Sequence, residues 1–413
     1  MTTDRFITPR IREAMADTPV VVVNGARQVG KSTLVTSLLN LPGRVEVLTL
    51  DHEGTRMAAA ADPRVFVDHA ADTLVIDEAQ LEPRLFRAVK ASVDADRRPG
   101  RFLITGSARL LAMPEMADAL VGRVEVVELW PFSELELAGD RRSVLDMIEA
   151  SPASIVRSQK SDRRKLAELM CRGGFPEVID RTQRRRGAWY ESYSTTSVTR
   201  IVNQISDLER VAEIPRLLRL LAARTSEELN VAKLASEFGW SARTVDSYLA
   251  QLSSAFVLQL LPAWSVNLSS KVVHRPKIHL MDTGLVAALS GANPQLLLSS
   301  PERFGALLET FVVMELRKQT GWSESRPTLW HFRDRGGAEV DLVIEYPDGR
   351  VVAVEVKSGA TPSPSDLRGL RLLRDRLGER FHHGYVASTA PEAHPIEKRL
   401  SAIPVTALWA PSG

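Results

Sequence analysis

The chain has 413 residues, of which 44% are hydrophobic and 25% are charged, and its formal net charge is +2. This length exceeds what one hydrophobic core usually supports, so two or three ordered domains are expected. The nearly balanced charge excludes an argument for nucleic-acid binding from total charge alone, so any such claim must rest on local patches.

The clearest chemistry lies in a glycine loop between a predicted strand and a predicted helix. Residues 20–33 read VVVVNGARQVGKST, and the four valines favour a strand that is buried on both faces. The following letters fit the P-loop pattern G-x-x-x-x-G-K-S/T, whose glycines let successive N–H groups point toward a phosphate. The helix adds its positive end to that site. We therefore predict that a nucleotide is bound by Gly25, Ala26, Arg27, Gln28, Val29, Gly30, Lys31, Ser32 and Thr33.

A second apolar strand, at residues 73–76, leads directly into Asp77 and Glu78, which is the Walker B pattern. In a P-loop protein Lys31 contacts the β- and γ-phosphates, while Ser32 and Asp77 hold Mg²⁺. Glu78 is then predicted to polarise the water that attacks the γ-phosphate. Adjacent acidic residues at a strand end are also common in solvated turns, and the preceding P-loop favours the catalytic interpretation.

Two further features of the N-terminal third indicate nucleotide chemistry less specifically. Residues 101–105 form another buried strand, and Thr105 and Ser107 near its end are both candidates for the polar sensor that faces the γ-phosphate. Turn chemistry is the alternative for both. Arg123 precedes a strand predicted at 124–129 and is a candidate catalytic arginine that stabilises transition-state charge, in cis or from a neighbouring subunit. The second case would require a homo-oligomer.

By this point the sequence resembles a family of prokaryotic AAA-type P-loop ATPases that carry a C-terminal domain of unknown function. The resemblance rests on the blocks GARQVGKST, LVIDEAQ, ITGSARLL and LVGRVEVVELWPFSELE, and it extends to GGFP at 173–176 and KIHLMDTG at 277–284. It implies an ATP-binding α/β core, a helical and winged-helix middle and a nuclease-like C-terminal fold. It is also the reason to expect ATP, because a P-loop recognises phosphates and not the base.

The middle of the chain is expected to be helical. Helices are predicted at 216–223, 230–238 and 241–255, with a turn at Gly239 and a following strand that begins a wing. In a DNA-binding version the third helix would enter the major groove with Arg243 as its cation. A lid or a protein-docking module is the alternative.

The C-terminal part contains an acidic hairpin, AEVDLVIEYPDGRVVAVEVK at 338–357, whose turn is PDG. Period-two alternation places Glu355 and Lys357 on one face of the second strand. The segment resembles the D…ExK pattern of the PD-(D/E)xK nuclease fold. This resemblance implies that Glu309, Asp341 and Glu355 bind a divalent metal and that Lys357 is catalytic, orienting the attacking water. The alternative is a solvated strand edge, and the fold is also used without turnover.

Together these features predict an α/β protein with a P-loop ATPase core at 1–140, a helical and winged-helix middle at 141–270 and a nuclease-like domain at 271–413. The leading function is Mg²⁺-dependent ATP hydrolysis that switches the attached module. The alternatives are an ATP-gated, metal-dependent DNA endonuclease and a non-hydrolysing switch that docks a protein partner. DNA, a protein and further copies of the chain are the candidate partners. The lone Cys171 and the absence of long apolar stretches predict a cytoplasmic protein without a membrane partner.

Overall fold

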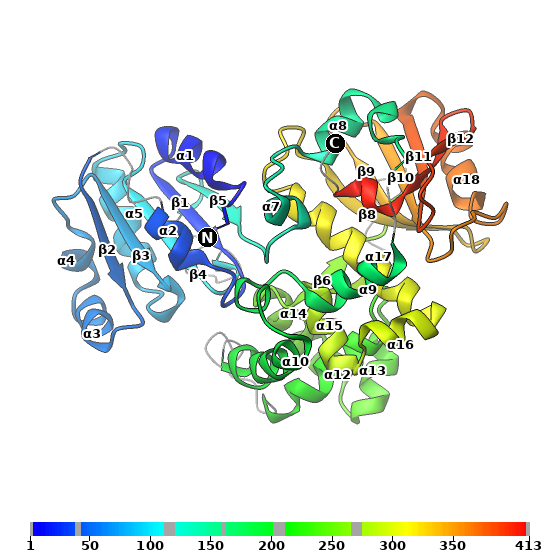
Figure 1. Ribbon diagram of the computed structural model, residues 1–413. Helices are drawn as coiled ribbons and strands as arrows, with labels where there is room; N and C mark the ends of the chain where they lie inside the picture. Colours follow the sequence, from blue (N-terminus) through cyan, green and yellow to red (C-terminus); the bar gives the residue numbers. More distant parts are fainter. Residues whose placement is uncertain are drawn as a thin grey trace.

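The computed structural model describes residues 3–37, 43–110, 120–158, 162–200, 211–265 and 275–409. Within these ranges two large sheets are separated by helices, and Figure 1 shows the N-terminal sheet in blue and cyan and the C-terminal sheet in orange and red. The expected domain boundary at residue 270 lies outside the described residues. No helix within the described ranges is long and apolar enough to cross a membrane.

The N-terminal sheet is parallel throughout, which confirms the expected α/β core. Its strand order is β2-β3-β4-β1-β5, so β1 lies between β4 and β5. All residues of β1 are buried, which explains its run of valines, because a strand covered on both faces needs apolar side chains at successive positions. The strands are β1 (Val20–Asn24), β2 (Val45–Thr49), β3 (Thr73–Asp77), β4 (Phe102–Gly106) and β5 (Val124–Glu128).

Helices cover both faces of this sheet. On one face, Ile11 of α1 and Leu34 of α2 belong to the same core as Val21, whereas on the other face Phe86 of α5 packs with Val22. Successive side chains of β1 point to opposite faces, so one strand contributes to both cores. The helices are α1 (Thr8–Asp17), α2 (Lys31–Ser37), α3 (Glu53–Ala61), α4 (Pro63–Val67) and α5 (Leu85–Ala95).

The residues after this sheet are mainly helical, as the sequence predicts. Helices α13 and α14 are joined at Gly239, whose φ of +65° lies in the left-handed region that glycine adopts freely. The strand β6 then pairs antiparallel with β7, so that Leu261 lies opposite Lys277. The winged-helix interpretation of these elements stays a prediction. The elements are α7 (Glu134–Ala138), α8 (Val144–Ala150), α9 (Arg163–Arg172), α10 (Gln183–Ser192), α12 (Ile214–Ala223), α13 (Val231–Phe238), α14 (Ala242–Ser254), β6 (Leu258–Leu261) and β7 (Lys277–Leu280).

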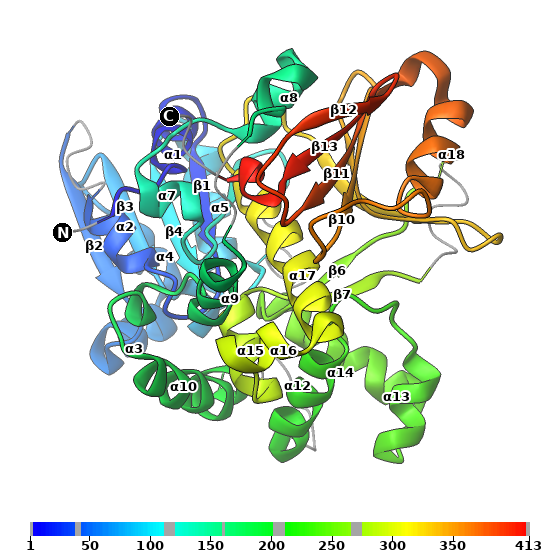
Figure 2. The same ribbon diagram turned by 45° about the vertical axis from the view of Figure 1, so that its right-hand side comes forward.

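The C-terminal sheet has the order β12-β13-β11-β10-β9-β8 and contains the expected antiparallel hairpin of β9 and β10. Helices α17 and α18 cover opposite faces, since Val312 of α17 belongs to the core of Leu342 and Leu370 of α18 to that of Val343. Figure 2 shows α17 in yellow and α18 in orange on the two sides of β10. The elements are α15 (Thr283–Ser290), α16 (Pro294–Ser299), α17 (Pro301–Gln319), β8 (Thr328–Arg333), β9 (Glu339–Glu345), β10 (Val351–Val356), α18 (Arg368–Leu377), β11 (Phe381–Ser388), β12 (His394–Glu397) and β13 (Leu400–Pro404).

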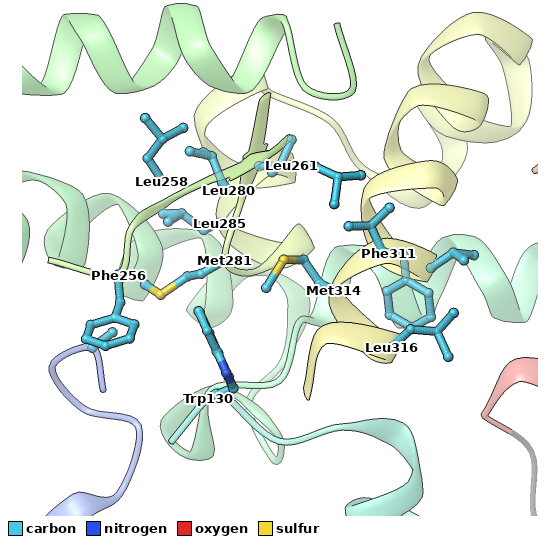
Figure 3. Close-up of a cluster of buried hydrophobic side chains, with 14 of the residues drawn as sticks. Trp130, Phe256, Leu258, Leu261, Leu280, Met281, Leu285, Phe311, Met314 and Leu316 are labelled. Carbon is cyan, nitrogen blue, oxygen red and sulfur yellow. The ribbon is translucent and has the colours of Figure 1, made fainter. Parts of the chain in front are cut away.

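The parts of the chain share one apolar core. Figure 3 shows Trp130, which follows β5, near Phe256 and Met281 of the middle and Met314 of α17. The rings of Trp130 and Phe256 meet edge to face with centroids 5.4 Å apart, a favourable arrangement for aromatic pairs. Farther along, the Tyr346 hydroxyl donates a hydrogen bond of 2.8 Å to a carbonyl of α8. The ATPase core, the helices and the C-terminal sheet are therefore held by direct contacts.

Candidate functional site

The predicted P-loop joins β1 to α2 at the carboxyl edge of the parallel sheet. The loop needs unusual backbone angles, with φ of 64° at Gln28 and 96° at Gly30. Glycine adopts such angles at no steric cost, whereas a non-glycine residue there is uncommon and often marks a functional turn. Helix α2 begins at Lys31, so its free N–H groups face the loop. This is the arrangement that binds a phosphate.

The side chain of Lys31 is buried beneath the loop. Its Nζ donates hydrogen bonds to the carbonyls of Gly25 and Ala26, each at 3.0 Å, and to the Ser107 hydroxyl at 2.9 Å. It also lies 3.9 Å from a carboxylate oxygen of Glu78. Burial lowers the pKa of Lys31, and the nearby carboxylates, first that of Glu78, oppose this shift. The lysine is thus held where the P-loop, the Walker B strand and the end of β4 meet.

The Walker B residues lie beside it. The Ser32 hydroxyl donates to Asp77 Oδ2 at 3.1 Å, and the Thr105 hydroxyl donates to the other oxygen of that carboxylate. Ser32 and Asp77 therefore present two hard oxygen donors side by side, which fits Mg²⁺, an ion that prefers carboxylate, hydroxyl and water oxygens.

Glu78 is bound by two neighbours. The Ser107 hydroxyl donates to Glu78 Oε1 at 2.8 Å, and the Gln80 amide donates to Oε2. Gln80 also accepts from the backbone N–H of Ser107 at 3.2 Å. The structure thus brings both sensor candidates to the site, Thr105 beside Asp77 and Ser107 between Lys31 and Glu78. Sequence reasoning missed Gln80, although it stands two residues after Glu78 in the block LVIDEAQ.

The two predicted arginines lie farther out. The guanidinium of Arg27 is 3.8 Å from a carboxylate oxygen of Asp51. Arg123 lies at the opposite edge of the sheet, because its carbonyl accepts from the N–H of Val20, the first residue of β1, while the P-loop follows the last. Its side chain pairs with Asp94 at 2.7 Å. The structure therefore does not bring Arg123 to the P-loop of its own chain, and a role toward a neighbouring subunit stays a prediction.

A cavity of about 460 Å³ opens beside the P-loop. Its wall includes Gly30 and Thr33 of the nucleotide-binding motif and Phe132, which follows β5. Pro176, the last residue of the GGFP turn, and Ile179 close another side. Segments far apart in the sequence thus enclose a partly apolar space next to the phosphate-binding loop.

The C-terminal residues predicted from the nuclease-like pattern also come together. Glu309 lies on α17, Asp341 on β9 and Glu355 on β10, and Lys357 Nζ pairs with Glu355 Oε1 at 2.8 Å. Asp341 Oδ2 accepts a hydrogen bond of 2.9 Å from the N–H of Val356. Burial, together with the charge of Asp341, raises the pKa of Glu355 to about 8.

The structure adds a residue that sequence reasoning missed. Lys277 of β7 places its Nζ 2.8 Å from Glu309 Oε1, 3.0 Å from Asp341 Oδ1 and 2.7 Å from Glu339 Oε1. Although burial opposes it, the charges of these carboxylates hold the pKa of Lys277 well above its usual value. Within the described ranges, no set of three or more His, Cys, Asp or Glu side chains could hold a metal ion. In this arrangement Glu309, Asp341 and Glu355 do not fit a metal site, because an ammonium already contacts two of them.

Comparison with protein families divides the chain into three matches. Residues 17–138 match the model of an AAA domain. Residues 163–296 match one domain of unknown function (DUF8612), and residues 304–408 match another (DUF4143). Among solved structures, the Walker-type ATPase paby2304 of Pyrococcus abyssi is 14% identical, with 70% of this chain and 96% of that chain covered and a TM-score of 0.38.

Two curated relatives match almost the whole sequence. They are the uncharacterized proteins Mb2031c of Mycobacterium bovis and Rv2008c of Mycobacterium tuberculosis, each 31% identical over 405 residues. The alignment covers 96% of this chain and 84% of each relative. The chain therefore belongs to the same family as these two mycobacterial proteins, and it carries an AAA-type P-loop ATPase domain at its N-terminal end.

Proposed function

We propose that this protein binds Mg²⁺ and ATP at the P-loop, hydrolyses the ATP, and uses the nucleotide state to switch the module that follows the ATPase core. One observation carries the proposal: Lys31, the Ser32–Asp77 pair and Glu78 come from the P-loop helix and the end of β3 and lie within contact distance of one another. A glycine loop that matched the P-loop pattern only by chance would not be expected to have its lysine beside a Walker B pair.

Each residue has a distinct role in this proposal. Lys31 would leave the carbonyls of Gly25 and Ala26 and contact the β- and γ-phosphates instead. Ser32 and Asp77 would hold the Mg²⁺, which when bound offsets the negative charge of the phosphate oxygens. Glu78, fixed by its neighbours, would accept the hydrogen bond that orients the attacking water.

The cavity beside the P-loop is the proposed site of the nucleoside. The cavity adjoins Gly30 and Thr33. When the phosphates of a nucleotide lie on the loop, its sugar and base must also lie next to these residues. The apolar surface of Pro176 and Ile179 suits a base, which gains from burial against apolar side chains, whereas the ring of Phe132 carries the guanidinium of Arg5 4.0 Å from its centroid. A base held there would contact both the ATPase core and the first helices of the middle.

Contacts of the nucleotide site with the middle support the switch. Arg109 follows the sensor candidate Ser107 by two residues, and its N–H donates to the carbonyl of Ser254 at the end of α14 at 2.8 Å. Its guanidinium lies 5.0 Å from the ring centroid of Phe256. On the other side of the site, the Tyr193 hydroxyl donates to the P-loop carbonyl of Arg27 at 3.3 Å. A movement of either loop would therefore change its contacts with the helical middle.

The test is a phosphate-release assay of the full chain with Mg²⁺ and ATP, with and without DNA. Lys31→Ala is expected to abolish nucleotide binding, and Glu78→Gln to preserve binding but stop turnover. The matched controls are Lys90→Ala on α5 and Glu82→Gln, whose carboxylate pairs with Arg84 away from the P-loop. Tight ATP binding by Lys31→Ala would refute the site. Background release by wild type, with DNA and protein partners present, would favour the non-hydrolysing switch instead.

Metal-dependent DNA cleavage is the second candidate. It is favoured by the convergence of Asp341, Glu355 and Lys357 on a sheet flanked by α17 and α18. For cleavage to occur, the Lys277 ammonium would have to leave the carboxylates. Incubation with supercoiled plasmid and Mg²⁺ or Mn²⁺, with and without ATP, tests this function. Nicking that persists in Asp341→Ala would assign the activity to another site or to a contaminant.

A further inference from the structure

The acidic cluster of the C-terminal domain contains its own cation. We name this cluster by its three carboxylates, Glu309, Glu339 and Asp341, which come from α17 and β9. The side chain of Lys277 is only 3% exposed, and its Nζ lies 2.7 to 3.0 Å from one oxygen of each carboxylate. The ammonium donates hydrogen bonds to Glu309 Oε1 and Asp341 Oδ1, and its contact with Glu339 Oε1 is an ion pair.

The backbone fixes this amine in place. β7 pairs with β6 along its whole length, with Leu261 opposite Lys277, and Ile278 and Leu280 on the same strand are buried in the shared core. The side chain of Lys277 extends from that sheet to the cluster. Without an internal cation the carboxylates of Glu309 and Asp341 would repel one another, because charges that close interact strongly away from water.

A divalent ion cannot share these oxygens with the amine. Mg²⁺ binds carboxylate oxygens at about 2.0–2.1 Å. An ion bridging Glu309 Oε1 and Asp341 Oδ1 would have to take the space and the lone pairs that Nζ uses at 2.8 and 3.0 Å. It would also meet the positive charge of the ammonium. One further oxygen, Glu355 Oε2, is buried without a hydrogen-bond partner, so the surroundings of the amine still have capacity for a ligand.

We propose that Lys277 is the resident cation of the acidic cluster: its ammonium takes the position of a divalent metal, and removal of the amine unmasks a site for Mg²⁺ or Mn²⁺. This inference does not depend on the activity of the P-loop. It concerns only the carboxylates. In this proposal Lys277 of β7 controls the access of a metal to the cluster, and the elements that carry the acidic residues do not.

The test is Mn²⁺ binding by the nucleotide-free full chain, followed as loss of the electron paramagnetic resonance signal of free Mn²⁺. Wild type is expected to bind no Mn²⁺ that depends on Asp341, whereas Lys277→Met is expected to bind one ion. Adding Asp341→Asn to Lys277→Met should abolish that binding. In a thermal melt, Lys277→Met should unfold at a lower temperature than wild type and regain part of the loss with millimolar Mn²⁺.

The matched control is Lys318→Met, which removes another buried lysine of the same region. Lys318 pairs with one carboxylate, Glu315, at 2.7 Å, so its loss should destabilise the protein without creating Mn²⁺ binding. Two results would overturn the proposal: Mn²⁺ bound by wild type and lost in Asp341→Asn, or a folded Lys277→Met that binds no Mn²⁺. Where Lys277→Met does not fold by circular dichroism, the same Mn²⁺ measurement is made on Lys277→Gln, which removes the ammonium and keeps a polar side chain, and a folded Lys277→Gln that binds no Mn²⁺ likewise overturns the proposal.

Discussion

Replacing Ser107 by alanine tests the geometry of the ATPase site most directly. The Ser107 hydroxyl accepts a hydrogen bond from Lys31 Nζ at 2.9 Å and donates one to Glu78 Oε1 at 2.8 Å. It is the only side chain in the described part of the site that bonds both the P-loop lysine and the predicted water-orienting carboxylate. Ser107→Ala removes both bonds and leaves the backbone bond to Gln80 intact.

The size of the effect follows from the charges involved. A hydrogen bond to a charged group contributes about 1.5–3 kcal/mol, and each 1.36 kcal/mol of barrier changes a rate about tenfold. If the orientation of Glu78 is worth one such bond in the transition state, kcat falls by about 10- to 100-fold. Nucleotide affinity should change little, because the lysine and the loop N–H groups that hold the phosphates remain.

The assay is phosphate release at saturating ATP and Mg²⁺, together with equilibrium binding of a fluorescent ATP analogue. Ser107→Thr restores the hydroxyl and should recover part of the rate. Thr105→Val provides the contrast: its hydroxyl donates to the Asp77 carboxylate and accepts from the backbone N–H of Glu78, but it does not bond the Glu78 carboxylate. This variant should therefore need more Mg²⁺ for half-maximal rate. An unchanged kcat in Ser107→Ala, or equal losses in Ser107→Ala and Ser107→Thr, would refute the role assigned to the hydroxyl.

Three further predictions concern the coupling and the C-terminal cluster. Tyr190→Phe removes a 2.7 Å hydrogen bond to buried Asp282 and should cost about 1.5–3 kcal/mol in a denaturation assay, more than Tyr193→Phe, whose hydroxyl donates at 3.3 Å to a neutral carbonyl. ATP should change the hydrogen exchange of α14 and β6 in wild type, and Arg109→Ala should remove that change; identical exchange in the two proteins would contradict this. Because the pKa of Glu355 in the folded state, about 8, exceeds its ordinary value of 4.5, its contribution to stability is complete below pH 4.5 and is lost as the pH rises through 8. The melting temperature of wild type should therefore fall relative to that of Glu355→Gln between pH 6 and 9, and a constant difference would count against a buried, proton-binding carboxyl.

The elements that could be predicted from the sequence are those with a local signature. A run of valines in a doubly covered strand, a loop of fixed spacing and a turn of proline, aspartate and glycine each depend on neighbours in the chain, so β1, the P-loop helix and the β9–β10 hairpin could be expected. Asp77 and Glu78 follow the same logic, since a strand that ends in acidic residues must bring them to the carboxyl edge of a parallel sheet.

The position of Arg123 could also have been deduced from the direction of its strand. The expectation that Arg123 acts in cis did not take that direction into account. A residue that precedes a parallel strand lies at the amino edge of the sheet, whereas a P-loop follows its strand and lies at the carboxyl edge. Lys277 is different. It is 32 residues from Glu309 and 64 from Asp341, and no periodicity connects them. Only the pairing of β7 with β6 brings the amine to the cluster, and that pairing depends on the folded middle of the chain.

The small sheet of β6 and β7 gives the two candidate sites a common element. At one end, Gln259 of β6 accepts a hydrogen bond of 3.4 Å from Arg109, which follows the sensor loop. At the other end, β6 pairs Leu261 with Lys277, whose amine contacts the acidic cluster. The hydrogen bonds of Lys277 to Glu309 and Asp341, at 2.8 and 3.0 Å, are lost once donor and acceptor separate to about 3.6 Å. A shift of the sensor loop that moved this sheet would therefore change the occupancy of the cluster by Lys277 without any direct contact between ATP and the C-terminal domain.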